Sequence, residues 1–70
     1  MRSFPARLRS LRERRGLDRK ALGELCGLSQ SIVGKYERGE KTPSLRALVA
    51  LADLLEVSLD DLLGRKFPPP

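Results

Sequence analysis

The stretch from Arg19 to Arg38 constrains the fold of this chain more than any other part. It holds two short segments in which apolar residues recur three or four positions apart, Leu22 with Cys26 and Val33 with Tyr36. This spacing places each pair on one face of a helix. A three-residue turn breaks the period between the two segments. The stretch therefore predicts two helices that pack their apolar faces together across a tight corner.

The turn carries residues that end one helix and begin another. Gly27 can take the left-handed backbone conformation that closes a helix without a Cβ penalty. Ser29 can cap the next helix, and Leu28 before it can pack onto Val33 as a hydrophobic staple. Gly23 leaves room in the first helix for the second to cross closely over it.

Turn and capping residues divide the remainder of the chain into three more segments of helical period. Pro5 suits the first turn of a helix, and Asp18, Ser44 and Ser58 suit N-caps. Residues 1–4 are expected to be loosely held. No alternation typical of a strand runs over four or more residues. The predicted fold class is all-α, with a five-helix domain over residues 1–64 (helices at about 5–15, 19–26, 30–38, 45–55 and 59–63) and a flexible proline-rich tail over residues 65–70.

The apolar residues at helical spacing form the expected core. Cys26 is expected to be a buried, inert thiol, with a redox switch as the alternative. The ring of Tyr36 should pack inside with its hydroxyl at the edge. Outside the helix pair, the predicted core residues are Leu8, Leu11, Leu45, Leu48, Leu51, Ala52, Leu55, Leu59, Leu62 and Leu63.

The composition excludes several classes of function. The chain has 70 residues, enough for one small core, and it contains no histidine and one cysteine. A zinc site, a disulfide framework and histidine-based acid–base catalysis are therefore excluded, and no metal, cofactor or enzymatic activity is expected. No run of about 18 apolar residues and no signal-peptide core occurs, so a cytoplasmic protein without membrane contact is predicted.

Basic residues are concentrated in the part of the chain that contains the helix pair. Residues 1–46 hold 12 Lys or Arg and 5 Asp or Glu, a balance of +7, whereas residues 47–64 hold 4 acidic residues and no basic one. Such asymmetry suits a polyanion on one side and another subunit on the other. The alternative is a basic surface that only aids solubility.

The chain resembles the phage repressor and Cro family of DNA-binding proteins. Residues 17–64 read LDRKALGELCGLSQSIVGKYERGEKTPSLRALVALADLLEVSLDDLLG. The family has a pattern close to LSQxxLAxxxGVSQSxISxxExGxxxPSxxxLxxLAxxLxVSLDxLL, and the elements fall in register without a gap. The resemblance covers roughly residues 8–64. It implies a five-helix, repressor-like fold in which residues 30–38 form a recognition helix that enters the major groove of double-stranded DNA.

The resemblance also implies which residues meet base edges. Gln30 and Ser31 lie at the leading end of the recognition helix, and the Gln30 amide suits the N6 and N7 atoms of adenine. Ile32 would touch a thymine methyl or else pack into the core. Lys35 would reach a guanine or a phosphate. Gly34 permits close approach to the duplex, although a glycine destabilises the helix by about 1 kcal/mol. Because few side chains then remain to discriminate bases, part of the specificity would come from DNA shape. The alternative for Gln30 is a solvated residue that only stabilises its own helix.

Contacts to the DNA backbone are implied on either side of the recognition helix. Arg19 takes the place of a glutamine that meets a phosphate in family members, and its charge should keep that role. Arg38, Lys41 and Thr42 should lie along the strand that follows. Affinity should fall as the salt concentration rises, with a slope of about 0.9 per neutralised phosphate in a plot of log affinity against log salt concentration.

A structural ion pair is implied between Arg12 and Glu37. Family members pair an arginine of the first helix with a glutamate near the end of the recognition helix, and these two residues occupy those places. A partly buried bidentate pair would fix the orientation of the two helices. The alternative is that both side chains are exposed.

The implied function is transcriptional regulation, most simply repression by occupying promoter DNA. A homodimer on a palindromic operator, with half-sites about one helical turn apart, is expected from the same resemblance. Its surface would be the acidic, leucine-rich C-terminal part. The candidate contacts, which have core packing as their alternative role, are Leu54, Leu59, Leu63 and Phe67. A second hypothesis is an antitoxin that blocks a toxin and regulates its own operon.

Overall fold

Five helices and no strand make up the part of the chain that the computed structural model describes, residues 3–65. The all-α class predicted from the sequence is therefore confirmed, and every helix begins and ends within one residue of its predicted position. The predicted tail lies, beyond its first residue, outside the described residues. The helices are α1 (Phe4–Arg14), α2 (Arg19–Cys26), α3 (Gln30–Glu37), α4 (Leu45–Leu55) and α5 (Leu59–Leu63).

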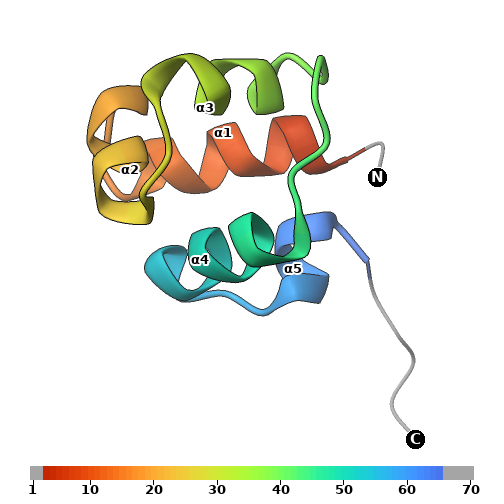
Figure 1. Cartoon of the computed structure of the whole chain (residues 1–70). Coiled ribbons are helices and arrows are strands. Elements are labelled where there is room, and N and C mark those ends of the chain that lie inside the picture. Colours follow the sequence, from red (N-terminus) through yellow and green to blue (C-terminus); the bar gives the residue numbers. More distant parts are fainter. Residues whose placement is uncertain (1–2, 66–70) are drawn as a thin grey trace, which may run out of the picture.

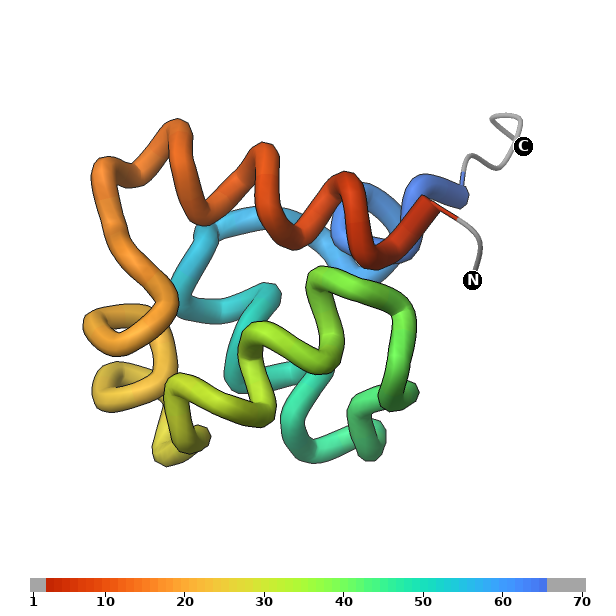
Figure 2. The backbone as a smooth tube through the Cα atoms, turned by 90° about the horizontal axis from the view of Figure 1, so that it is seen from above, coloured from red at the N-terminus to blue at the C-terminus, as the bar shows by residue number. Residues whose placement is uncertain are grey.

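The helices are arranged around one core with the α2–α3 corner on one side. Figure 1 shows α3 running alongside α1, while α4 and α5 close the opposite side of the molecule. In the view from above, α5 lies beside the N-terminal end of α1 (Figure 2). The Nε of Arg7 in α1 donates to the carbonyl oxygen of Asp61 in α5 at this contact. The N-terminal helix is thus tied both to the corner and to the C-terminal part.

Four of the five helices begin with a side-chain cap at the predicted residue. The Asp18 carboxylate accepts from the Ala21 N–H at 2.7 Å, and the Ser29 hydroxyl accepts from the Ile32 N–H at 3.1 Å. The Ser44 hydroxyl accepts from the Ala47 N–H at 3.2 Å, and the Ser58 hydroxyl accepts from the Asp61 N–H at 3.0 Å. Each such cap stabilises a helix by about 1 kcal/mol.

The core contains one residue that the sequence pattern did not predict. Phe4 is 2% exposed, and its ring packs edge-to-face against Tyr36 with centroids 6.4 Å apart. The expectation that residues 1–4 are loosely held is therefore wrong for Phe4, because this aromatic contact begins α1 and joins it to α3. Residues 1 and 2 lie outside the described part.

One predicted core residue lies outside the core. Leu45, the first residue of α4, is 69% exposed, because the first turn of this helix presents Ala47 and Leu48 to the interior instead. The stripe that follows, through Leu51 and Leu55, is buried as predicted. Leu59 and Leu63 in α5 are half-buried around the fully buried Leu62, and they pack against the same core.

Candidate nucleic-acid interface

The turn between α2 and α3 lies directly on α2 at Gly23. A Cβ on this residue would be only 2.5 Å from the carbonyl oxygen of Leu28, and the Leu28 N–H donates to the carbonyl oxygen of Gly23 at 2.7 Å. The close approach predicted at Gly23 is therefore present, although it is made by the turn rather than by the crossing helix. Gly27 ends α2 in the left-handed conformation with φ 70°. These contacts set the position of α3 relative to α2.

The structure brings Arg12 and Glu37 together in a buried pair. The Nε of Arg12 donates to Glu37 Oε2 at 2.6 Å and its Nη2 donates to Oε1 at 3.1 Å. A third donor, Nη1, reaches the carbonyl oxygen of Leu17 at 2.8 Å. The hydrogen bond to Glu37 raises the pKa of Arg12 against the opposing effect of burial. The pair fixes the end of α3 against α1 and against the turn before α2.

A second arginine also binds Glu37, and the sequence pattern did not predict it. The Nε of Arg19 donates to Glu37 Oε1 at 3.2 Å, and the Glu37 side chain is only 1% exposed. Arg19 is 39% exposed, so part of its side chain reaches the surface. The sequence did show an arginine at position 19, where family members usually have a glutamine. It did not show that this arginine binds Glu37, because the two residues are far apart in the sequence. One carboxylate thus joins α1, α2 and α3 and is flanked by two positive charges.

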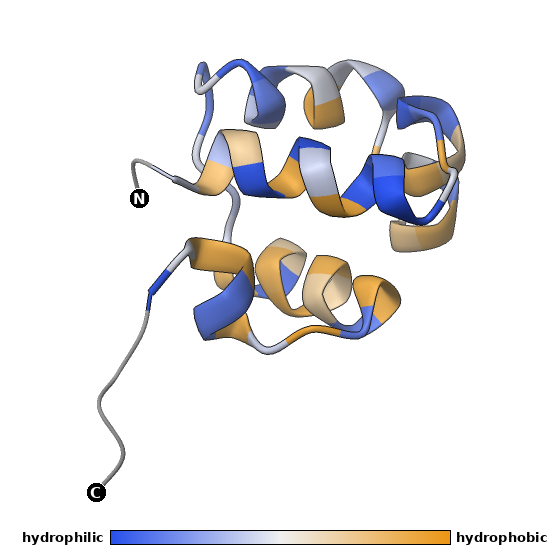
Figure 3. Cartoon of the chain, turned by 180° about the vertical axis from the view of Figure 1, so that it is seen from behind, coloured by the Kyte–Doolittle hydropathy of each residue, from blue (hydrophilic) through white to orange (hydrophobic). Residues whose placement is uncertain are grey.

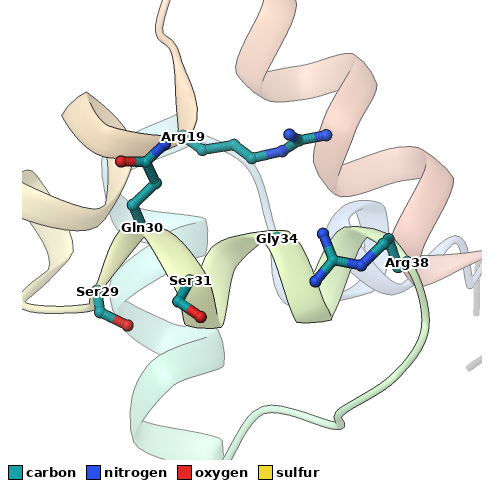
Figure 4. A pocket seen from close by; sticks show the side chains of 6 residues that line it. All are labelled: Arg19, Ser29, Gln30, Ser31, Gly34 and Arg38. Carbon is teal, nitrogen blue, oxygen red and sulfur yellow. The ribbon is translucent and has the colours of Figure 1, made fainter.

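A hollow lies over the exposed face of α3. Figure 4 shows Arg19 on one side of it and the α3 face on the other, with the Arg38 guanidinium turned back along the helix toward Gly34. The hollow gathers three of the predicted base contacts and two of the predicted phosphate contacts. Its lining residues are Arg19, Ser29, Gln30, Ser31, Gly34 and Arg38.

The other predicted contacts lie beside the hollow. Lys35 is exposed, and Lys41 and Thr42 are exposed on the loop that follows α3. Ile32 is half-buried and packs against the hydrophobic core, which favours the core alternative for this residue. The exposed predicted residues therefore extend from the start of α2, along α3, to residue 42.

A second acidic residue at this surface, Glu40, was also missed by the sequence pattern. The Nε and Nη2 of Arg38 donate to Glu40 Oε2 at 2.8 Å and to Oε1 at 3.3 Å. The hydrogen bond from Arg38, with a smaller contribution from the charge of Lys35, lowers the pKa of Glu40. Arg38 and Glu40 flank Gly39 in the sequence, a spacing compatible with a pair only once the chain reverses at that glycine.

Cys26 lies at the edge of the core on the far side of this corner. Its thiol is half-buried and donates to the carbonyl oxygen of Ala50 in α4, with a sulfur–oxygen distance of 3.7 Å. Burial raises the pKa of Cys26, so less thiolate is present at neutral pH than for an exposed cysteine. These features favour the inert thiol over the redox switch.

Residues 3–65 contain neither a cluster of metal-binding side chains nor a helix that could span a membrane. Within that range no group of three His, Cys, Asp or Glu side chains is placed to hold a metal ion. No helix there is long and apolar enough to cross a bilayer. Figure 3 shows hydrophobic residues dominating the α4–α5 part, whereas α1 carries several strongly hydrophilic ones. Arg9, Arg14 and Arg15, in and just after α1, are exposed, so basic side chains reach the surface in this part.

Comparison with known proteins gives one consistent family. The profile described as "Helix-turn-helix domain" matches residues 4–63. The HTH-type transcriptional regulator AnsR of Bacillus subtilis is 40% identical over 60 residues, covering 86% of this chain and 52% of that protein. This chain spans about half the length of several curated relatives that it matches.

Two solved structures share nearly the whole fold. The restriction-modification controller protein C.AhdI from Aeromonas hydrophila has a TM-score of 0.81 and 40% identity, with 86% of this chain and 91% of that chain covered. The P22 c2 repressor in complex with a synthetic operator also has a TM-score of 0.81, with 32% identity and coverage of 84% and 89%. The similarity therefore extends over more than four fifths of each of the chains compared.

Proposed function

The chain belongs to the helix-turn-helix domain family, and we propose that it is a sequence-specific, double-stranded DNA-binding repressor that reads the major groove with α3. The observation that supports this most is the hollow over α3, in which an amide, hydroxyls and two guanidinium groups meet on an exposed helix face. The major groove admits one α-helix and offers donors and acceptors to such groups. The P22 c2 repressor, which shares this fold, is described in complex with operator DNA.

The base edges would be read from the leading half of α3. Gln30 and Ser31 are exposed at its N-terminal end, which is the end that points at bases in this docking mode. The Gln30 amide would bind adenine through one donor and one acceptor. Lys35, one turn beyond Ser31, would reach a guanine or a phosphate. Ile32 would contribute at most the exposed part of its side chain.

The DNA backbone would be held at both ends of the reading helix. Arg19 is half-exposed at the start of α2, where it stands beside backbone N–H groups that favour an anion. Its Nε is fixed by Glu37, so the guanidinium is oriented before DNA arrives. Lys41 and Thr42 would meet the strand beyond the other end of α3. Arg38 differs from these residues because Glu40 already accepts from two of its nitrogens.

A homodimer on a palindromic operator would provide the specificity that one small domain lacks. Half-sites would be about one helical turn apart, as this docking mode requires. The α4–α5 part is the proposed contact surface, and Leu54, Leu59 and Leu63 are half-buried there. Phe67, the fourth candidate, lies outside the described residues. Repression by occupying DNA needs no catalytic group or cofactor, and it would take place in the cytoplasm.

The test is selection of duplexes from a random pool, followed by binding of the recovered sequence over a salt series. The proposal expects a recovered sequence with two-fold symmetry, bound about a thousandfold or more tighter than scrambled duplex. Recovery of no common sequence would overturn it. The antitoxin alternative gains no support from the relatives named above, which are described as a transcriptional regulator, a controller protein and a repressor.

A further inference from the structure

The missing side chain at Gly34 is replaced in space by a guanidinium group. A Cβ on Gly34 would lie 2.9 Å from Nη1 of Arg38, so this arginine lies against the helix backbone at the centre of the reading face. Gly34 is buried, although it belongs to the lining of the hollow. The Arg38 side chain therefore covers the face instead of extending outward along the course expected for a phosphate contact.

Glu40 holds the guanidinium in this orientation. It accepts from Nε and Nη2 of Arg38, the two-point geometry that a phosphate would also use. The position of Glu40 is itself fixed, because its N–H donates to the carbonyl oxygen of Lys35 at 2.9 Å and Gly39 reverses the chain with φ 72°. Two of the five guanidinium N–H donors are thus used within the protein. The remaining three are on Nη1 and Nη2.

Resting on the function proposed above, we propose that Glu40 is a positioning residue for specificity: it directs Arg38 across Gly34 toward a guanine and prevents this arginine from serving as a sequence-independent phosphate anchor. The end of a guanidinium offers two parallel N–H groups to the O6 and N7 of guanine. A carboxylate beside it repels a fully charged phosphate more strongly than the partial charges on the O6 and N7 of guanine. The observed pair therefore favours base reading over the phosphate role expected for Arg38 from the sequence.

Removal of the Glu40 charge should then strengthen the contact of Arg38 with phosphates and weaken its contact with a base. In Glu40→Gln the Arg38 side chain is released to nearby phosphates, so scrambled duplex should bind more tightly and its log–log salt slope should steepen by about 0.9 for each bound subunit. The preference for the recovered sequence over scrambled duplex should fall by about tenfold, the lower range for one lost bidentate base contact. The free energy of unfolding should hardly change, because both side chains are half-exposed.

The matched control is Glu13→Gln. Glu13 is also exposed and pairs with an arginine, Arg9, but Arg9 lies on α1 and does not line the hollow, whereas Arg38, the partner of Glu40, does. This variant makes the same change in net charge and should keep the wild-type preference.

The experiment measures binding of recovered and scrambled duplexes by fluorescence anisotropy for wild type, Glu40→Gln, Arg38→Ala and the double variant. The inference expects Glu40→Gln to lower the preference in the wild-type background and to leave it unchanged when Arg38 is absent. An unaltered preference in Glu40→Gln, or an equal loss in the Arg38→Ala background, would overturn it. If the wild type recovers no sequence at all, the proposed function itself fails, which is a different result from either of these.

Discussion

Glu37 shows how a single residue can organise three helices at once. Its carboxylate is almost fully removed from solvent and accepts from Arg12 and Arg19, so its burial depends on both partners. A buried pair contributes little net stability compared with apolar packing, but removing one member leaves a charge without its partner in the interior. The role of Glu37 is therefore to fix orientation, and the stability of the fold becomes sensitive to its partners.

Arg12→Ala should lower the free energy of unfolding by about 3–5 kcal/mol, because Glu37 would keep only the half-exposed Arg19. Urea unfolding monitored by circular dichroism measures this. The control is Arg9→Ala, which removes an exposed pair with Glu13 and should cost at most about 1 kcal/mol. Equal stability of the two variants would show that the buried pair does not have the role assigned to it.

Gln30→Ala should leave folding intact and weaken discrimination at one base pair by about 1–3 kcal/mol, the value of one bidentate base contact. The side chain is exposed at the first position of α3, so no core packing is lost. Binding to a set of duplexes with single substitutions in the recovered sequence measures the effect. Ser10→Ala, an exposed change on α1, is the control and should preserve every preference. A Gln30→Ala profile identical to wild type would remove Gln30 from the reading face.

At the scale of the helical elements, ends and caps were predictable because their signals are local. Asp18, Ser29, Ser44 and Ser58 all cap their helices as predicted, each by accepting a hydrogen bond from a backbone N–H. The burial of Phe4 was not predictable in this way, since it depends on Tyr36 in another helix. The exposure of Leu45 likewise depends on how α4 is rotated against the rest of the core, which the period of one segment does not determine.

The end of α4 differs from the ends of the other helices, each of which is followed by a glycine in the left-handed conformation. Glu56 takes the left-handed conformation with φ 56°, although it carries a side chain, and its carboxylate pairs with Arg15 at 2.7 Å. This conformation costs an ordinary residue about 1 kcal/mol or more. The sequence has no local signal for it, so a helix end at this residue was inferred only from the cap of the helix that follows.

Glu56→Gly should therefore be more stable than Glu56→Gln by about 1 kcal/mol, because both variants lose the Arg15 pair but only glycine relieves the backbone. Thermal unfolding of the two variants measures this difference in stability. Comparison of wild type with Glu56→Gln gives the contribution of the Arg15–Glu56 pair. A glycine variant less stable than the glutamine variant would contradict the strained conformation at this position.

At the scale of the whole molecule, charge and shape are divided between two parts. The net positive charge and the hollow belong to the α1–α3 part, whereas residues 47–64, which hold most of α4 and all of α5, carry four acidic residues and no basic one. The sequence predicted this division and the face that α3 would present. It did not predict the pairs Arg19–Glu37 and Arg38–Glu40, because each depends on side chains that only the folded chain brings within reach.

Lys41→Ala should weaken binding to recovered and scrambled duplexes by the same factor and reduce the log–log salt slope by about 1 for each bound subunit, as expected of a phosphate contact. Lys41 is exposed on the loop after α3, so the fold should be unaffected. Anisotropy titrations between low and physiological salt measure both quantities. A change in preference between the two duplexes would instead assign Lys41 to base reading.

The central claim is that the surface formed by the start of α2, the exposed side of α3 and the loop to residue 42 is the one that meets DNA. Its most direct test is a titration of ¹⁵N-labelled protein with the recovered duplex, followed by backbone and side-chain amide resonances. The account predicts that the largest shifts occur at Arg19, at Gln30 with its side-chain amide, at Ser31 and Gly34, and over residues 38–42, while α4 shifts little. Shifts concentrated on α4 and α5, with the Gln30 amide unchanged, would contradict it.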